Sequence, residues 1–158
     1  NYRSFASQNA SMPPYVMNTR IYSCNLIYHR FNRPDGKPFY WRGRYNEDTI
    51  ISLDMLTAGL CTVQFNAFLQ DKLRTQVLGG GNTAEFYKSE GTKPKSRMLY
   101  DVYPEYTELV WKFQREHHHV NYLPFKDMKL KRKPGIEPTG VNDYGMKLYR
   151  LPESPGRI

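Results

Sequence analysis

Residues 47–57 constrain the fold of this chain most, because their apolar side chains point in nearly every direction around a helix. These side chains are Ile50, Ile51, Leu53, Met55 and Leu56. At about 100° per residue they do not share one narrow stripe, so we expect other elements to cover the helix on most sides. Asn46 is the predicted N-cap, since its side chain can accept from a free backbone N–H one turn ahead. Gly59 supplies the left-handed position that ends the helix.

Two adjacent carboxylates, Glu47 and Asp48, open this helix. They directly follow two arginines and an aromatic pair: Trp41, Arg42, Arg44 and Tyr45. The helix dipole favours negative charge here, so both acids can simply stabilise the helix. A carboxylate pair at the mouth of a buried helix can also act as a general base or as metal ligands. The residues alone leave both interpretations open.

Charge limits the partners that fit this chain. It carries a formal net charge of +8 over 158 residues, a length that suits one domain with a single core. The excess of Lys and Arg favours an anionic partner, with nucleic acid first and nucleotide phosphates second. The 13 tyrosines suit stacking on bases beside phosphate contacts.

Two further features bear on location and redox chemistry. The opening residues 1–11 form neither an apolar signal segment nor a membrane span, so we expect a soluble, intracellular protein without a membrane partner. Cys24 and Cys61 lie in apolar, strand-like runs without CxxC or Cys/His spacing. We predict buried thiols, not zinc ligands or a disulfide.

Composition divides the chain into three segments. Residues 1–14 are polar, end in two prolines and indicate an extended arm or the end of an upstream element. Residues 15–133 alternate strand and helix signals and form the predicted domain. Residues 134–158, rich in Pro and Gly, indicate an extended, basic or partly ordered tail.

Within the domain, period-two alternation predicts strands at residues 15–28 and 60–65. Pro and Gly in residues 32–37 predict a tight turn before the central helix. A later helix around residues 98–103 should stop at Pro104, which then begins a second helix through Phe113. Strand, hairpin, helix and strand in this order predict an α/β or α+β fold.

A glycine-rich loop follows the second strand. It comprises Gly79, Gly80, Gly81, Asn82 and Thr83. Backbone N–H groups of such a loop can bind phosphate at a helix N-terminus. The spacing matches neither GxxxxGK[ST] nor GxGxxG, so the residues favour a plain flexible loop over a phosphate-binding one.

Three consecutive histidines, His117, His118 and His119, lie on a segment predicted to be extended. Neighbouring side chains of an extended segment face opposite sides, so at most two can converge on one ion. One of them can be catalytic or bind metal, or the cluster can be packed or solvated. The basic run that follows includes Lys129, Lys131, Arg132 and Lys133, which can track a phosphate backbone or form a solvated tail.

Several sequence blocks, in this order, resemble the TET-associated glycosyltransferase family. The blocks are Asn18–Ser23, Trp41–Thr49, Phe65–Phe68, Gly80–Thr83, His118–Tyr122 and Pro124–Lys126. The resemblance covers roughly residues 13–133 and leaves the tail uncovered. It implies a phage enzyme, working in the cytoplasm of the infected bacterium, that places sugars on 5-hydroxymethylcytosine or a related pyrimidine in DNA.

The resemblance also implies a fold and site residues. The fold would be GT-A-like, with a mixed sheet and flanking helices, in which an xED motif opens a helix. Asn46, Glu47 and Asp48 match that motif, which makes Asp48 the general base and Glu47 an orienting or ligand carboxylate. His118 or His119 would approach a metal-bound diphosphate, with Mn²⁺ or Mg²⁺ as the ion and a UDP-sugar as donor.

The resemblance also implies binding roles for other residues of these blocks. Arg42 and Arg44 would pair with phosphate or hold the carboxylates, and Trp41 would stack on a flipped base. Gly80, Gly81, Asn82 and Thr83 would contact phosphate. GT-A enzymes usually carry a DxD motif in a donor-binding half, and this sequence contains none. We therefore expect the chain to be the C-terminal, acceptor-side half, completed by an N-terminal half or a second polypeptide.

Two other functions are consistent with the same residues. One is a nucleic-acid-binding module without catalysis, which would use the basic run and surface aromatics. The other is a metal-dependent nuclease built on the histidine run, although the second histidine expected after a helix is absent.

Overall fold

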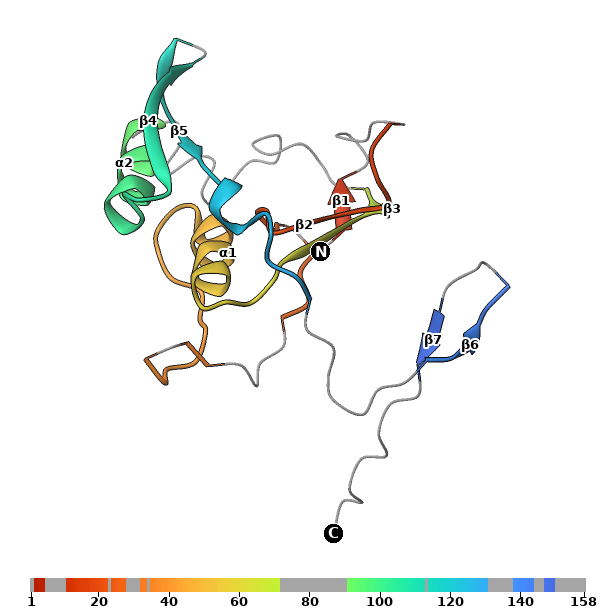
Figure 1. Ribbon diagram of the computed structural model, residues 1–158. Coiled ribbons are helices and arrows are strands. Elements are labelled where there is room, and N and C mark those ends of the chain that lie inside the picture. The colour runs from red at the N-terminus through yellow and green to blue at the C-terminus, as the bar shows by residue number, and fades with distance from the viewer. Residues whose placement is uncertain are drawn as a thin grey trace. The chain divides into compact units, whose positions relative to one another are not determined.

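The computed structural model describes residues 2–4, 11–22, 24–27, 32–33, 35–71, 91–112, 114–130, 138–143 and 147–149 (Figure 1). These belong to two units, Asn1–Met128 and Lys129–Ile158. The elements in chain order are β1 (Tyr2–Ser4), β2 (Tyr15–Met17), α1 (Glu47–Thr57), β3 (Val63–Gln70), α2 (Lys93–Val102), β4 (Thr107–Lys112), β5 (Arg115–Val120), the 3-10 helix η3 (Leu123–Phe125), β6 (Pro138–Val141) and β7 (Lys147–Tyr149).

The first unit contains a small mixed sheet in the strand order β1-β3-β2. β1 pairs with β3 in parallel, and β2 pairs with β3 antiparallel, so that Tyr2 and Tyr15 both lie opposite Phe65. β1 falls within the segment that the sequence indicated as an arm. The predicted mixture of helices and strands is confirmed, while the GT-A topology stays a prediction.

Helix α1 lies at the centre of the first unit, as the sequence predicted. Every side chain from Thr49 to Leu56 is buried. The core combines Ile50, Leu53 and Leu56 of α1 with Leu99 of α2 and Phe125 of η3. Full burial of each such side chain contributes roughly 2 kcal/mol. The unit is therefore built around α1, with α2 and η3 packed on it.

Both ends of α1 fix its position. At the C-terminus Gly59 has the predicted left-handed backbone, with φ of 79°. The N–H of Gly59 donates to Leu56 and that of Leu60 to Met55, which is the Schellman arrangement. At the N-terminus the predicted side-chain cap is wrong. Asn46 is itself left-handed, and its amide donates to the carbonyl of Lys95 at 2.7 Å, which ties α1 to α2.

The strand predicted at residues 15–28 is mostly wrong. Only Tyr15–Met17 forms a strand, and residues 21, 22 and 24–27 form none. Asn18 ends β2 with a φ of 57°, and its side-chain amide donates to the carbonyls of Phe125 and Met128. The N–H of Ile21 then donates to Ser52 Oγ on α1. These long-range bonds draw the chain onto the helix and away from the sheet.

Other local predictions have mixed outcomes. The turn at residues 32–37 is confirmed by a bridge between Asn32 and Pro38 and by the left-handed Gly36. The second strand begins at Val63, later than predicted, and extends to Gln70. Cys24 is exposed and Cys61 is half-buried, so the buried positions predicted for them are wrong.

The helix predicted from Pro104 to Phe113 is also wrong. Thr107–Lys112 is strand β4, which pairs antiparallel with β5. Its Thr, Val and Trp side chains favour strand, and the left-handed Gln114 follows in the turn before β5. Leu109 and Val110 therefore lie on opposite faces of a hairpin, because successive strand residues alternate.

The second unit contains the β6–β7 hairpin, in which Val141 lies opposite Lys147. It falls within the segment for which the sequence indicated an extended or partly ordered tail. Among the helices of the described residues, none has the length and apolar character needed to cross a membrane.

Candidate active site

Asp48 lies in the first turn of α1 with its side chain 27% exposed. One carboxylate oxygen, Oδ1, accepts the backbone N–H of Thr49 at 2.7 Å. The other, Oδ2, faces the Arg20 guanidinium at 3.9 Å. Neither Arg42 nor Arg44 seals this carboxylate. The helix end therefore orients Asp48, whose side chain stays partly exposed beside the Arg20 cation.

A second group of side chains, from α2 and β5, lies near Asp48. Ser96 Oγ and His118 Nδ1 lie 3.3 Å apart. Burial lowers the pKa of His118 to about 4, and the nearby cations Lys95 and Arg20 act in the same direction, whereas Asp48 opposes them. His118 is therefore a neutral imidazole at pH 7.

Tyr122 belongs to the same neighbourhood. Burial is the main cause that raises the pKa of the Tyr122 hydroxyl. Arg20 opposes this shift and Asp48 adds to it. Its hydroxyl is buried without a hydrogen-bond partner among the described residues. A buried, neutral phenol without a partner keeps its donor available, and such groups call for an explanation in a folded protein.

The structure thus brings together two residues singled out in the sequence, Asp48 and His118. It adds four that were missed: Arg20, Lys95, Ser96 and Tyr122. Arg20 and Tyr122 fall within the blocks that carry the family resemblance, which is a signal that could have found them. Lys95 and Ser96 have no signal in the sequence, because only the packing of α2 on β5 places them here.

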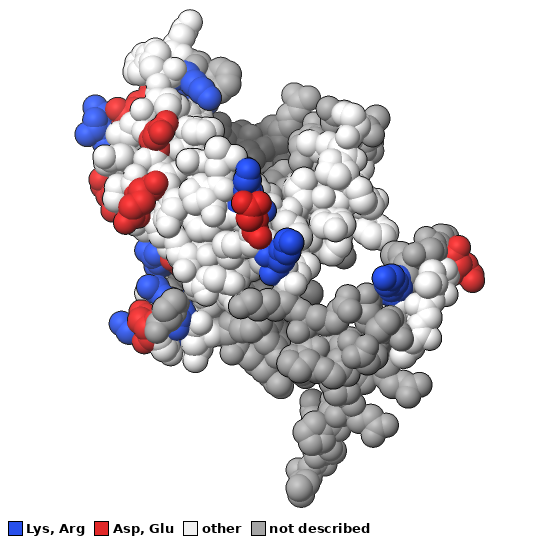
Figure 2. Space-filling model, viewed as in Figure 1, with Lys and Arg blue, Asp and Glu red and all other residues white. Residues whose placement is uncertain are grey.

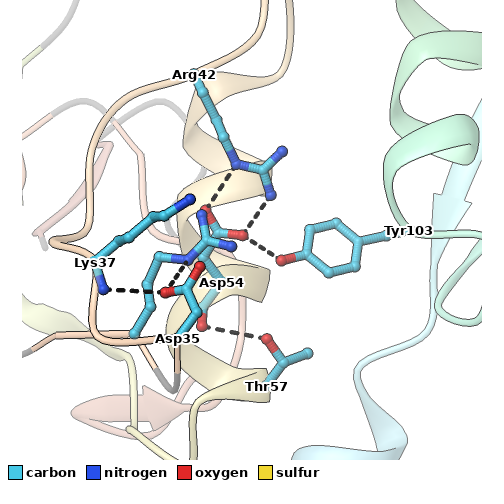
Figure 3. Close-up of polar contacts among 7 residues, drawn as sticks. Asp35, Lys37, Arg42, Asp54, Thr57 and Tyr103 are labelled. Atoms are coloured by element: carbon cyan, nitrogen blue, oxygen red, sulfur yellow. Dashed lines mark hydrogen bonds and ion pairs between the residues drawn. The ribbon is translucent and has the colours of Figure 1, made fainter.

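Arg42 has a different partner from those predicted. Its guanidinium binds both oxygens of Asp54, at 2.6 Å and 3.2 Å, and Tyr103 also donates to this carboxylate (Figure 3). Asp54 has a side chain only 4% exposed. The hydrogen bond to Asp54 raises the pKa of Arg42. The prediction that Arg42 holds the helix-opening acids is therefore corrected: it neutralises a buried acid two turns into α1. Its predicted contact with phosphate stays a prediction.

The remaining predicted residues are placed as follows. Glu47 is exposed beside Asp48, and Trp41 is 50% exposed. The guanidinium of Arg44 lies 5.7 Å from the Tyr45 ring centre. Lys129 is exposed in the second unit. Outside the described residues lie Gly80, Gly81, Asn82, Thr83, Lys131, Arg132 and Lys133.

His118 and His119 do not form one metal-binding pair. They are neighbours on β5, so their rings project to opposite faces of the hairpin. His118 faces α2, while His119 is exposed opposite Glu108. Within the described part of the chain, no three His, Cys, Asp or Glu side chains come together in a way that could hold a metal ion.

Fold and site together define a mixed α/β protein with a candidate acid–base centre at a helix N-terminus. The chain belongs to the TET-associated glycosyltransferase family, whose model matches residues 1–81. This name implies glycosyltransferase activity. The matched region contains Arg20 and Asp48 and ends before His118. No curated protein and no solved structure matches the chain.

The environment of His118 leads to a pH prediction. Because folding lowers its pKa from an ordinary value near 6.5 to about 4, the unfolded chain binds the proton more readily. The contribution of His118 to stability is thus full above about pH 6.5 and is lost as pH falls toward 4. We expect an NMR titration midpoint near pH 4 for the His118 ring, assigned with His118→Gln. A midpoint near pH 6.5 would contradict the packing described.

Proposed function

We propose that this chain transfers a sugar from a nucleotide sugar to the hydroxymethyl group of 5-hydroxymethylcytosine, or a related hydroxymethylpyrimidine, in DNA. The observation that carries the proposal is the partly exposed Asp48 carboxylate, fixed at the mouth of α1 beside Arg20. Family membership supplies the reaction class. The acceptor and the setting, a phage-infected bacterial cytoplasm, follow from the resemblance and are part of the proposal.

In this mechanism Asp48 is the general base. Its Oδ2 accepts the proton of the acceptor hydroxyl as the hydroxyl oxygen forms a bond to the anomeric carbon. The bond from that carbon to the diphosphate oxygen breaks, and its electron pair leaves with the nucleoside diphosphate. Negative charge thus moves from Asp48 to the leaving group. Arg20 and Lys95 supply positive charge in this neighbourhood, which would stabilise the departing diphosphate.

The donor site needs parts beyond those described. The resemblance predicts Mn²⁺ or Mg²⁺ on the diphosphate, and the described residues do not by themselves bring three His, Cys, Asp or Glu side chains together for such an ion. The sequence has no DxD motif. We propose that a donor-binding half or a second polypeptide completes the donor site.

Mass spectrometry tests the proposal directly. Hydroxymethylated DNA is incubated with the protein, Mn²⁺ and a panel of nucleotide sugars, and the nucleosides are analysed after digestion. We expect one sugar added per modified base with at least one donor, and none on matched DNA that contains only cytosine. DNA binding without any sugar transfer would instead support a non-catalytic binding module. Plasmid nicking with Mg²⁺ and no nucleotide sugar would support a nuclease.

A further inference from the structure

The β4–β5 hairpin is anchored at one end and exposed at the other. At the anchored end Thr107 is only 2% exposed, and Val120 packs against the core. Near the other end Trp111 is 75% exposed, one of the most exposed large apolar side chains described. A large aromatic side chain exposed to water near the outer end of a hairpin suits contact with a flat, apolar partner surface.

Strand register relates Trp111 to the candidate active site. Trp111 lies opposite Glu116, and Leu109 lies opposite His118. Because side chains alternate along each strand, Trp111 and His118 belong to the same face of the hairpin. The two positions differ by two residues along the hairpin, which is about 7 Å. The exposed indole is therefore a near neighbour of the candidate site.

Two cationic residues form the last strand pair before the turn of the hairpin. Lys112 and Arg115 lie directly opposite each other, and both are exposed. Like charges directly opposite in a sheet are destabilising, so this pair has no role in holding the hairpin together. The adjacent Glu116 is already bound by Arg97 at 3.1 Å. By the same alternation they lie on the face of the hairpin opposite to Trp111, so two positive charges flank the outer end of the hairpin from its other side.

Net charge alone does not locate such a surface. Among the described residues on the face in view, Figure 2 shows Lys and Arg interspersed with Asp and Glu and not gathered into one basic patch. The local combination of an indole and two paired cations is therefore the more specific signal. Aromatic side chains that stack on bases, next to cations that bind phosphates, are the common means by which proteins hold unstacked nucleic acid.

We propose that Trp111, Lys112 and Arg115 form a DNA-contacting wedge. Lys112 and Arg115 bind backbone phosphates, and Trp111 stacks on the bases beside the nucleotide that enters the site, replacing the stacking lost when that nucleotide leaves the duplex. This inference rests on the proposed function, since it assigns the substrate surface of the same site.

The stacking role is tested by comparing duplex and single-stranded hydroxymethylated DNA. Trp111→Ala should reduce kcat/KM at least tenfold on the duplex and less than threefold on the single strand, because only the duplex requires a base to be extruded. Trp111→Phe should restore most of the activity. The matched control is Leu26→Ala, which removes a side chain that is 95% exposed and should act like the wild type. Equal losses on both substrates would overturn the wedge.

The phosphate role is tested by binding, which needs no turnover. Lys112→Gln with Arg115→Gln should reduce the slope of log K against log salt by about 2, because each phosphate contact contributes roughly 0.9. Lys37→Gln with Lys93→Gln is the control of equal charge and should leave the slope unchanged. An unchanged slope in the hairpin variant would refute the inference.

The proposed function and the DNA-contacting wedge can be refuted independently of each other. If the wild type transfers no sugar, the proposed function is wrong, and 2-aminopurine placed beside the target base still reports extrusion. A fluorescence increase with the wild type that is absent with Trp111→Ala supports the wedge. The same increase with both proteins overturns it. Normal sugar transfer by Trp111→Ala on duplex DNA overturns the wedge and leaves the proposed function intact.

Discussion

Asp48→Asn should lower the rate of sugar transfer by about 10²–10⁴, the usual contribution of a positioned general base. Asn is nearly isosteric, and its side-chain oxygen can still accept the Thr49 N–H that orients Asp48. What the variant loses is the ability to take the acceptor proton. DNA affinity should therefore stay within about twofold. Single-turnover rates on hydroxymethylated DNA, together with binding titrations, measure the two quantities separately.

The matched control for this prediction is Asp101→Asn. It makes the same change of charge in the first unit, at an exposed residue of α2. It should keep full activity. Glu47→Gln distinguishes the two acids of the motif, because Glu47 is exposed and has no predicted role in proton transfer. Asp48→Asn with undiminished turnover would show that the helix-opening acids serve only the helix dipole.

Local sequence predicted those features that depend on neighbouring residues. The span of α1 and its Schellman end follow from apolar residues spaced over the helix and from Gly59, and both are confirmed. Strand β2 stops at Asn18 because the side chain of that residue binds carbonyls more than one hundred positions away. No local pattern carries that information. The β4–β5 hairpin was missed because a proline followed by spaced apolar residues suits a helix start equally well.

In the candidate site, too, the residues marked by contiguous sequence were predictable, and those placed by long-range packing were not. Asp48 was identifiable because its motif is contiguous, and His118 because a run of histidines is conspicuous. Their common neighbourhood, however, depends on α2, through Ser96 and Lys95. For Arg42, the nearest acids along the chain were Glu47 and Asp48. The helix turns Asp54 inward instead, where an unpaired carboxylate would be costly and a cation is required.

Arg42→Ala should lower the free energy of unfolding by about 3 kcal/mol, because it leaves the Asp54 carboxylate buried without its cation. Asp54 is almost fully enclosed and would retain the Tyr103 hydroxyl as a donor. The variant is therefore destabilised by an uncompensated charge as well as by a lost contact. Urea unfolding at pH 7 measures the difference, provided that the slope of the free energy against urea is unchanged.

Arg97→Ala is the control that separates the effect of burying the ion pair from the effect of its two-bond geometry. Arg97 also binds its carboxylate partner through two nitrogens, at 3.1 Å and 3.4 Å to Glu116, but its side chain is 55% exposed. Water screens that pair, so its loss should destabilise the protein much less than the loss of Arg42. Replacing Asp54 by Asn in the Arg42→Ala background should recover part of the loss, since the buried charge is then removed. Equal costs for Arg42→Ala and Arg97→Ala, with no recovery in the double variant, would mean that the Asp54 carboxylate is solvated and not buried in the core.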